Sequence, residues 1–483
     1  MTAEPTDPTR SGADTRHEEP IGQASIVVLF GATGDLSQRL VLPALFQLSC
    51  LGLVERFAVV GNGRGQLSDD EFRHEARQAC ERAAGDDFDE RAWHAFAPHL
   101  RFAGNGFTAE DPGDLPRVLA EVTAELGPDV ARLLYLAVPP ERFEPLTRAF
   151  AAHDLVEGSR VVYEKPFGTS FASFRQLDDA AHDVLDEDQI FRIDHFLGKE
   201  ATHDLHVVRF ANGLFSRVWD GHHIDSVQID VPETLDVSNR GSFYDATGAV
   251  LDMIVTHLVQ LVAEVAMETP FCLEPDDIAA SRTAVLDHLR PIRPEDVVLG
   301  QYEGYRDTDG VDDDSTTETY AALRVELDTD RWRGVPFILR TGKALAASAQ
   351  QVTVIFRPPA QHCGFEDGLN ALTFDLAGEG SVGLRMLARE PSASSDSAVV
   401  PVTVTLPLGE ISTQQPLPAY VGLIYDALRG DRSRFTRPDG LASVWAAFEP
   451  LLEAKPKPIS YPIGSWGPAE ADRLVDPQPW AIA

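Results

Sequence analysis

Four side chains suited to acid–base chemistry or phosphate binding are concentrated in ten residues, FRIDHFLGKE at 191–200. They are Arg192, Asp194, His195 and Lys199, set around phenylalanine and leucine. The residues before Asp194 are typical of a strand end, and those around Lys199 of a helix start. His195, Lys199 and free helix N–H groups could then converge on a phosphate, while Asp194 orients a histidine from elsewhere. A salt-bridge network at an interface is an equally good interpretation of this spacing.

Two other stretches carry candidate catalytic groups. Asp252 and His257 lie in the mostly apolar stretch at 249–267, which predicts a long buried helix. A histidine on such a helix is more often a satisfied core residue than a catalyst, so both interpretations stay open. Lys165 ends the predicted strand SRVVYEKP at 159–166, and the strand ends of a parallel sheet face the ligand crevice.

A glycine turn follows the first apolar run, SIVVLF at 25–30, which is typical of a strand buried on both faces. Glycine at this point lets the backbone approach a pyrophosphate, and the next helix supplies N–H donors. We expect the turn to contact a dinucleotide through Gly31 and Gly34, with Asp35 and Leu36 next along it. Only part of the GxGxxG pattern is present, so a plain tight turn is the alternative.

The end of the second predicted strand, FAVVG at 57–61, distinguishes between cofactors. An NAD site requires an acidic residue there for the ribose hydroxyls. The chain instead continues as NGRGQ, with Arg64 and no acid. A permanently charged, bidentate guanidinium suits the 2′-phosphate of NADP, so we expect NADP as the cofactor. An exposed loop arginine without a ligand is the alternative.

The order of predicted elements indicates two domains. Up to about residue 200, strands alternate with helices, which predicts a Rossmann-like, doubly wound parallel sheet. Beyond it, strand-like runs with hairpin-sized gaps predict a mostly antiparallel sheet with helices. The fold class is therefore α/β plus α+β. We expect a disordered tail at 1–24, a dinucleotide-binding domain at 25–198, and a substrate-binding and oligomerisation domain at 199–483.

Composition narrows the classes of partner. Over 483 residues, 43% are hydrophobic and 24% charged, and the formal net charge is -35. Such a surface repels nucleic acid and anionic membranes, so any phosphate site must be a local basic pocket. No apolar run reaches the roughly 18 residues of a membrane span. The four cysteines form no CxxC pair or metal cluster, and the N-terminus lacks the apolar core of a signal peptide, which favours the cytoplasm.

Nine stretches resemble glucose-6-phosphate dehydrogenases in order and spacing, over about residues 25–475. They read FGATGDL, YLAVPP, EKPFG, FRIDHFLGKE, VRFAN, RGSFYDATG, THLVQ, VPFILRTGKAL and YPIGSWGPAEAD. The resemblance implies NADP-dependent oxidation of a hexose 6-phosphate at C1, with D-glucose 6-phosphate as the first candidate and 6-phospho-D-glucono-1,5-lactone as the product. It also implies a homodimer or homotetramer and no metal.

The resemblance further implies a role for each matching residue. His257 matches the general base, and Asp194 matches the carboxylate that orients it. His195 and Lys199 match ligands of the sugar phosphate. Lys165, Glu233, Asp252 and Lys343 match residues that hold the sugar hydroxyls, and Lys165 also borders the cofactor. Thr33 and Arg64 match contacts to NADP.

The chain departs from the family pattern at several of these places. Gln38 and Leu40 stand where lysines are common, and Phe196 replaces a tyrosine whose hydroxyl would reach the phosphate. The other departures are Thr256 for asparagine, Leu251 where arginine is frequent, and Ala349 near the place of a second lysine. The changes at Phe196, Thr256, Leu251 and Ala349 motivate one alternative, a paralogous dehydrogenase for another, modified hexose 6-phosphate. The loss of basic residues at Gln38 and Leu40 motivates the other, a non-catalytic regulatory homologue.

Overall fold

The computed structural model describes residues 20–272, 274–359, 369–390, 398–410 and 417–482. Most of the predicted tail at 1–24, and Cys363, lie outside these residues. Contacts divide the chain into two compact units. The first ends at Phe107 and includes Pro112–Leu133, and the second comprises Thr108–Asp111 and the chain from Leu134 onward.

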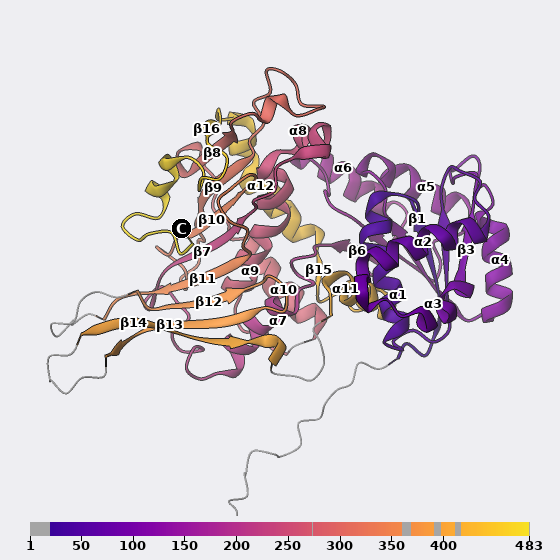
Figure 1. The fold of residues 1–483 in the computed structure, drawn as a ribbon, viewed down its shortest axis with the longest axis horizontal. Helices are drawn as coiled ribbons and strands as arrows, with labels where there is room; N and C mark the ends of the chain where they lie inside the picture. Colours follow the sequence, from indigo (N-terminus) through magenta and orange to yellow (C-terminus); the bar gives the residue numbers. More distant parts are fainter. Residues whose placement is uncertain (1–19, 273, 360–368, 391–397, 411–416, 483) are drawn as a thin grey trace, which may run out of the picture. The chain divides into compact units, whose positions relative to one another are not determined.

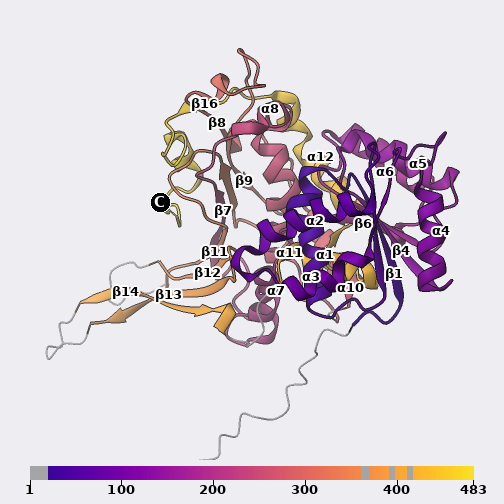
Figure 2. The same ribbon diagram turned by 45° about the vertical axis from the view of Figure 1, so that its right-hand side comes forward.

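The first unit is built around parallel strands (Figure 2). Strand β1 (Ala24–Phe30) is buried along its whole length and pairs with β2 (Phe57–Asn62), which pairs with β3 (Leu100–Ala103). The helices of this unit are η1 (Ser37–Val41), α1 (Leu42–Cys50), α2 (Asp69–Ala84), η2 (Gly85–Asp87), α3 (Glu90–Phe96), η3 (Ala97–His99) and α4 (Leu115–Leu126). A capping box formed by Ser68 and Glu71 starts α2, as its Ser–Asp–Asp–Glu sequence predicts.

Strand β4 (Val130–Leu136) passes from the first unit into the second. With β5 (Ser159–Tyr163), β6 (Ile190–Ile193) and β15 (Phe435–Thr436), it completes a seven-stranded sheet of order β15-β6-β5-β4-β1-β2-β3. Strands β5 and β6 are parallel, and the short edge strand β15 runs antiparallel to β6. The predicted parallel sheet is therefore confirmed, although β15 comes from near the C-terminus.

The second sheet has nine strands in the order β14-β13-β12-β11-β7-β10-β9-β8-β16 (Figure 1). Its strands are β7 (Ile224–Pro232), β8 (Val297–Tyr302), β9 (Tyr320–Val325), β10 (Phe337–Gly342), β11 (Gln351–Phe356), β12 (Ala371–Asp375), β13 (Ser381–Arg389), β14 (Val399–Pro407) and β16 (Ile459–Tyr461). Its pairs are antiparallel except β7 with β10 and β8 with β16. The predicted, mostly antiparallel sheet is confirmed.

The second unit also contains the remaining helices. The α-helices are α5 (Phe143–Ala152), α6 (Phe171–His182), α7 (Glu200–His206), α8 (Gly241–Ala249), α9 (Val259–Ala266), α10 (Pro275–Leu286), α11 (Ala419–Arg429) and α12 (Pro438–Ala454). Two π-helical segments are η6 (Val207–Ala211) and η8 (Val250–Leu258). The short 3₁₀ turns are η4 (Pro140–Arg142), η5 (Glu187–Gln189), η7 (Ser238–Arg240), η9 (Pro294–Asp296), η10 (Tyr305–Asp307), η11 (Leu408–Glu410) and η12 (Ala469–Leu474).

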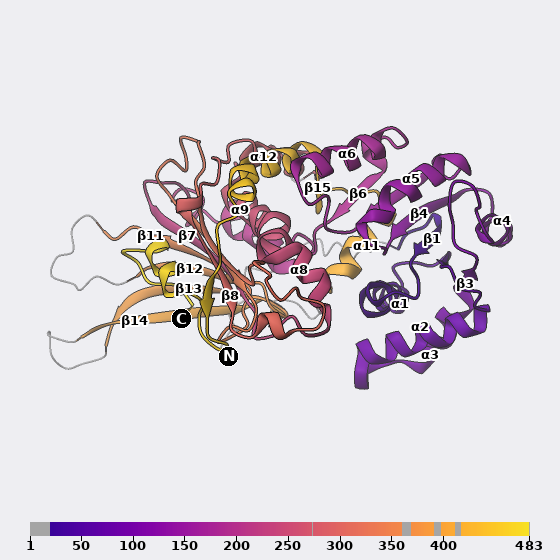
Figure 3. The same ribbon diagram turned by 90° about the horizontal axis from the view of Figure 1, so that it is seen from above.

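The long helix predicted at 249–267 is η8 followed by α9. Segment η8 contacts β9 and β10 on one face of the second sheet (Figure 3). Contrary to the prediction from the sequence, the stretch Gly241–Ala266 is apolar and long enough to cross a membrane, although Asp252 and His257 interrupt its apolar residues. Its most apolar window is 83% buried inside the protein, which is typical of a core helix.

The C-terminal segment also packs on the second sheet. Gln228 of β7 donates to the carbonyl of Pro479 at 3.0 Å and accepts from the backbone N–H of Ala481 at 2.7 Å. Arg340 of β10 is paired with Asp230 at 2.6 Å and lies against the ring of Trp480, 4.0 Å from its centroid. Gln228 and Arg340 are buried and hydrogen-bonded, which marks a structural contact, whereas Oδ2 of Asp230 has no hydrogen-bond partner among the described residues.

Candidate active site

The residues predicted for substrate and catalysis all lie in the second unit, at the ends of strands and on one helix. Lys165 follows β5, and Asp194 and His195 follow β6. Lys199 is the N-cap residue of α7, and η8 carries both Asp252 and His257. A π-helical segment is rare and occurs frequently at functional sites.

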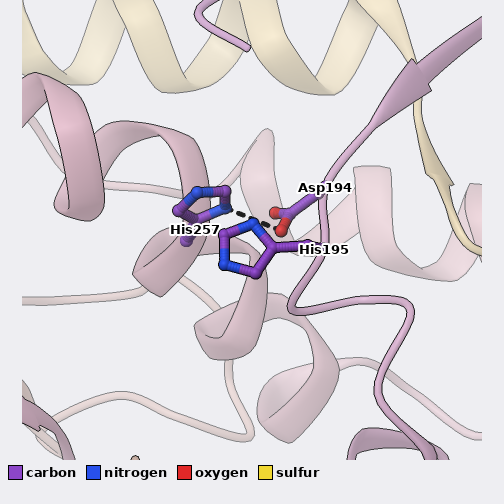
Figure 4. A group of neighbouring side chains, drawn as sticks. All are labelled: Asp194, His195 and His257. Carbon is purple, nitrogen blue, oxygen red and sulfur yellow. Dashed lines mark hydrogen bonds and ion pairs between the residues drawn. The ribbon is translucent and has the colours of Figure 1, made fainter. Parts of the chain in front are cut away.

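His257 and Asp194 form a buried hydrogen-bonded pair (Figure 4). Nδ1 of His257 lies 2.7 Å from Oδ1 of Asp194, which also accepts from the backbone N–H of Phe196 at 2.9 Å. Because an ionised carboxylate only accepts, Nδ1 carries the proton and Nε2 has a free lone pair. Nε2 is buried and has no hydrogen-bond partner among the described residues. This arrangement can accept a proton at Nε2 and stabilise the resulting imidazolium.

His195 lies directly beside this pair. The centroids of its ring and of the His257 ring are 4.3 Å apart, in an edge-to-face arrangement (Figure 4). Burial holds the pKa of His195 well below its usual range, and His257, Lys165 and Lys199 lower it further. His195 is therefore a neutral hydrogen-bonding group at neutral pH, unless a bound anion restores its proton.

Lys199 is held by neighbours from the second sheet. Its Nζ donates to the carbonyl of Leu376 at 2.8 Å and to Oε1 of Gln350. Burial lowers the pKa of Lys199 to about 8, although Asp375 opposes the shift. Gln350 was not predicted, and it lies next to Ala349, where the sequence lacks an expected lysine. An amide thus contacts Lys199 near the position where a second cation was expected.

Phe196 is buried next to Lys199 and His257, with 1% of its surface exposed. Its ring centroid lies 5.1 Å from Nζ of Lys199 and 5.1 Å from the centroid of the His257 ring. The phenylalanine therefore packs against the catalytic candidates and supplies the face of an aromatic ring to an ammonium group.

Two lysine–carboxylate pairs involve the four residues predicted to hold sugar hydroxyls. Nζ of Lys165 lies 2.7 Å from Oδ1 of Asp252, and Nζ of Lys343 lies 2.6 Å from Oε1 of Glu233. Burial would raise the pKa of Asp252, but Lys165 outweighs it, and Lys343 and His257 also act in the lowering direction. The two pairs therefore share one electrostatic environment with His257, and each offers donors and acceptors to a polyol.

The register of β7 and β10 explains the Lys343–Glu233 pair. These parallel strands pair Pro232 with Gly342, so the next residue of each chain segment emerges at the same end of the sheet. The backbone N–H of Glu233 donates to the carbonyl of Gly342 at 2.9 Å. Strand β7 was not recognised in the sequence, so this pairing could not be predicted from spacing.

The structure shows the contacts or the exposure of three residues that depart from the family pattern, Thr256, Ala349 and Leu251. The hydroxyl of Thr256 donates to the carbonyl of Asp252 at 2.7 Å, within the π-helical segment. The backbone N–H of Ala349 donates to the carbonyl of Pro232 at 3.1 Å, and Leu251 is partly exposed. A cavity of about 30 Å³ is lined by Lys165, Asp194 and Thr256, among others, and is large enough for one water.

Glu164 is a buried carboxylate that sequence reasoning missed. Its Oε1 accepts from the hydroxyl of Tyr135 at 2.6 Å, and its Oε2 from that of Tyr420 at 3.4 Å. Burial raises the pKa of Glu164, against these hydrogen bonds and the charge of Lys165. Its position directly before Lys165 in EKPFG is the only local signal for it.

Asp194, His195 and His257 also form a group that could offer ligand atoms to a metal ion, since those atoms lie within 4.8 Å of one another. The hydrogen bond between His257 and Asp194 already uses one atom from each. The geometry is thus that of an oriented base.

The residues predicted for the cofactor lie in the first unit, except Lys165, which belongs to the second. The backbone N–H groups of Gly31 and Ala32 donate to the carbonyl of Asn62 at 3.0 and 3.2 Å, which joins the glycine turn to the end of β2. Gly31 has a φ of 79°, a conformation that favours glycine. Thr33, Asp35 and Arg64 are exposed, whereas Gly34 and Leu36 are partly buried.

The charges around this turn suit a phosphate-bearing dinucleotide. Among the described residues, no hydrogen bond or ion pair engages the guanidinium of Arg64. Asp35 is paired with Arg39 at 3.3 Å, so the carboxylate nearest the turn is partly neutralised. Gln38, which replaces an expected lysine, donates to the carbonyl of Thr33 at 3.4 Å and accepts from Arg82 at 3.3 Å. Arg82 was not predicted from the sequence.

Comparisons with known proteins agree with these two units. Residues 28–204 match the family model of the glucose-6-phosphate dehydrogenase NAD binding domain, and residues 206–481 match that of the C-terminal domain. The chain is 35% identical to "Glucose-6-phosphate 1-dehydrogenase 2" of Mycobacterium tuberculosis, over 97% of this chain and 96% of that protein. It is 34% identical to the glucose-6-phosphate 1-dehydrogenase of Chlamydia muridarum, over 93% and 95% of the two chains.

Two solved structures share the fold over nearly the full length. The glucose-6-phosphate 1-dehydrogenase of Mycobacterium avium superposes with a TM-score of 0.85 at 33% identity, covering 95% of this chain and 99% of that one. A glucose-6-phosphate dehydrogenase in complex with its substrate glucose-6-phosphate also gives 0.85, at 29% identity, covering 94% and 97%. The chain belongs to the glucose-6-phosphate dehydrogenase family, with a nicotinamide dinucleotide-binding domain followed by the family's C-terminal domain.

Proposed function

We propose that this chain oxidises D-glucose 6-phosphate at C1 with NADP⁺ and releases 6-phospho-D-glucono-1,5-lactone. The observation that carries the proposal is the buried His257–Asp194 pair, whose free Nε2 lies in the same neighbourhood as His195 and the two lysine–carboxylate pairs. Membership of the family supports the same reaction.

In the proposed reaction His257 is the general base. Its Nε2 takes the proton of the C1 hydroxyl while the C1–H bond breaks and C1 becomes a carbonyl carbon. Asp194 accepts the Nδ1 hydrogen bond, so it holds the ring in the reactive tautomer and stabilises the imidazolium that forms. The nicotinamide supplies the acceptor for the hydride that leaves C1.

In the proposed complex, different side chains bind the phosphate and the hydroxyls of the sugar phosphate. His195 and Lys199 are the proposed ligands of the phosphate, whose charge favours the protonated form of both side chains. Lys165, Glu233, Asp252 and Lys343 are the proposed partners of the sugar hydroxyls. Gln350 holds Lys199 near a position where a second cation was expected, so the phosphate site has fewer positive charges than the family pattern implies.

NADP is the proposed cofactor in preference to NAD. Support comes from the exposed Arg64 at the end of β2, whose guanidinium has no partner within the described part of the chain. It comes also from the absence of an acid in the sequence of that loop and from the glycine turn beside it. Thr33, Asp35 and Leu36 would border the dinucleotide, with Gly31 and Gly34 allowing its close approach. Lys165 is a further proposed contact to the cofactor.

We also infer that the protein is a cytoplasmic homodimer or homotetramer that binds neither nucleic acid nor membrane. Curated relatives from Arabidopsis thaliana and Solanum tuberosum carry the word cytoplasmic in their names, which supports the location. The domain limits 25–198 and 199–483 and the disordered tail at 1–24 stay predictions.

The test is steady-state kinetics of the purified chain with glucose 6-phosphate, following NADPH or NADH by absorbance. We expect turnover with NADP⁺ and weaker turnover with NAD⁺. Substitutions at Thr256 and Phe196, beside the base, favour a second candidate, a paralogue for a modified hexose 6-phosphate. A panel of hexose phosphates that gave higher kcat/KM for a modified sugar would support it, and no turnover with any of them would indicate the non-catalytic homologue.

A further inference from the structure

The helix that carries Asp252 and His257 starts abruptly. Gly248, near the end of α8, has φ 64° and ψ 175°, which interrupts the helical backbone there. Regular helical geometry resumes at Ala249, and η8 begins at Val250, two residues before Asp252 and seven before His257. Wherever a helix starts, its first backbone N–H groups need partners from outside the helix.

Glu318 supplies both of the partners that the structure gives to this start. The backbone N–H of Ala249 donates to the carbonyl of Glu318 at 3.0 Å, and that of Val250 donates to its Oε1 at 2.9 Å. A methyl group at Gly248 would lie 2.4 Å from Oε1 of Glu318, so the glycine leaves the space that the carboxylate fills. A carboxylate is also the charge that a helix N-terminus favours.

The segment around Glu318 reaches the other sugar-binding candidates as well. The carbonyl of Thr319 accepts from the backbone N–H of Lys343 at 2.8 Å, and β9 begins at the next residue. Burial raises the pKa of Tyr244, and the carboxylates of Asp252 and Glu318 raise it further, so both carboxylates lie near this phenol. Glu318 therefore contacts the start of η8, its neighbour Thr319 holds the backbone of Lys343, and both Glu318 and Asp252 lie near the phenol of Tyr244.

We propose that Glu318 is a positioning residue, which sets the axial position of η8 and through it the places of His257 Nε2 and the Asp252 carboxylate. The inference rests on the proposed function for the roles of those two residues. The carboxylate touches neither substrate nor cofactor in this proposal. It acts by capping, and a displaced cap lets the first turn of η8 move relative to Asp194 and Lys165.

Three substitutions separate the cap from its charge. Glu318→Gln keeps an oxygen acceptor at the same reach without a charge. Glu318→Asp keeps the charge but withdraws the carboxylate by one methylene, and Glu318→Ala removes both. Glu326→Ala is the matched control, because Glu326 follows the other end of β9, is 44% exposed and pairs with Arg290 at 3.0 Å.

The first readout is kinetic. We expect Glu318→Asp and Glu318→Ala to lower kcat/KM for glucose 6-phosphate at least about tenfold, the effect of losing a helix cap, with the KM for NADP⁺ unchanged. Glu318→Gln should stay within about threefold of wild type, since its amide oxygen still accepts from Val250. Equal losses in the Gln and Asp variants would overturn the proposal, as would wild-type kinetics in the Asp variant.

The second readout does not depend on turnover. Amide hydrogen exchange at Val250–Ile254 should accelerate about tenfold in Glu318→Asp and Glu318→Ala, but not in Glu318→Gln or Glu326→Ala. Unchanged exchange in the Asp variant would overturn the capping role even if kinetics changed. If the wild-type chain failed to oxidise any hexose phosphate, the proposed function would fall, and the exchange data would still decide whether Glu318 holds η8. If Glu318→Ala failed to fold, the Gln and Asp variants would carry both readouts.

Discussion

Nδ1 of His257, on a buried helix, lies 2.7 Å from Oδ1 of Asp194, which follows a strand 63 residues earlier in the chain. The two side chains are 1% and 2% exposed. In so little solvent, the carboxylate and the imidazole depend on each other for hydrogen bonding, and the pair fixes which nitrogen of the ring is basic. The free Nε2 is therefore the single atom on which the proposed chemistry depends.

Replacing this base should separate chemistry from binding. For His257→Asn we expect kcat to fall by about 10²–10⁴-fold, with the dissociation constants for glucose 6-phosphate and NADP⁺ nearly unchanged. Asparagine can keep a hydrogen bond to Asp194, so the helix should stay in place. Stopped-flow turnover and calorimetric binding would test this, and a variant with more than roughly a tenth of wild-type kcat would mean that another group is the base.

The cofactor preference should depend on Arg64. For Arg64→Ala we expect a much larger rise in KM for NADP⁺ than for NAD⁺, because only NADP⁺ carries the 2′-phosphate that a guanidinium binds. The loss of a charge-assisted hydrogen bond costs about 1.5–3 kcal/mol, or roughly a 10- to 150-fold rise in KM. Arg117→Ala, which removes an exposed arginine of α4 paired with Glu121 and outside the predicted cofactor residues, is the control. Equal effects on both cofactors would exclude Arg64 from the 2′-phosphate site.

The phosphate site should weaken in alkaline solution. Burial lowers the pKa of Lys199 to about 8, so the fraction of ammonium falls as the pH rises through this value. A phosphate dianion binds the charged form, and KM for glucose 6-phosphate should therefore rise by up to about tenfold per pH unit above about pH 8. Lys199→Arg keeps its charge over this range, so its KM should lack this rise. Parallel KM profiles in the two proteins would show that Lys199 does not control the pH dependence.

Glu318 should also make the free energy of unfolding depend on pH. Burial raises the pKa of Glu318 to about 7, from 4.5, against the N–H donor of Val250. A raised pKa means that the folded state binds the proton more tightly than the unfolded state does. The stabilisation of the folded state by this proton is therefore complete below the pKa of Glu318 in the unfolded chain, and it is lost as the pH rises through about 7. Relative to Glu318→Gln, which does not titrate, the wild type should lose on the order of 1–3 kcal/mol of unfolding free energy between about pH 5 and about pH 8. Urea unfolding at the two pH values measures it, and a constant difference between the proteins would contradict the shifted titration.

Local features of the chain made much of the fold predictable. The buried strand at 25–30, the glycine turn after it and the Ser68 cap are recognisable because each depends on a few consecutive residues. The alternation of strands and helices, followed by hairpin-sized gaps, likewise predicts the two sheets. Strand β7 was missed because Gln228 and Asp230 interrupt its apolar pattern, and the hydrogen-bond partners of these two side chains lie 251 and 110 residues away in the chain.

The sequence by itself determined which chemical groups are present, and it placed His195 and Lys199 close together because they are neighbours in the chain. It also determined that Arg64 has no acid beside it at the end of the second strand. Only the tertiary structure decided that Lys165 pairs with Asp252, Lys343 with Glu233 and Lys199 with Gln350. These partners are 87, 110 and 151 residues apart, so their contacts follow from strand register and helix packing, which no local pattern encodes. The hydrogen bond by which Glu318 caps η8 is also a long-range contact, because Glu318 accepts it from the backbone N–H of Val250, 68 residues earlier in the chain.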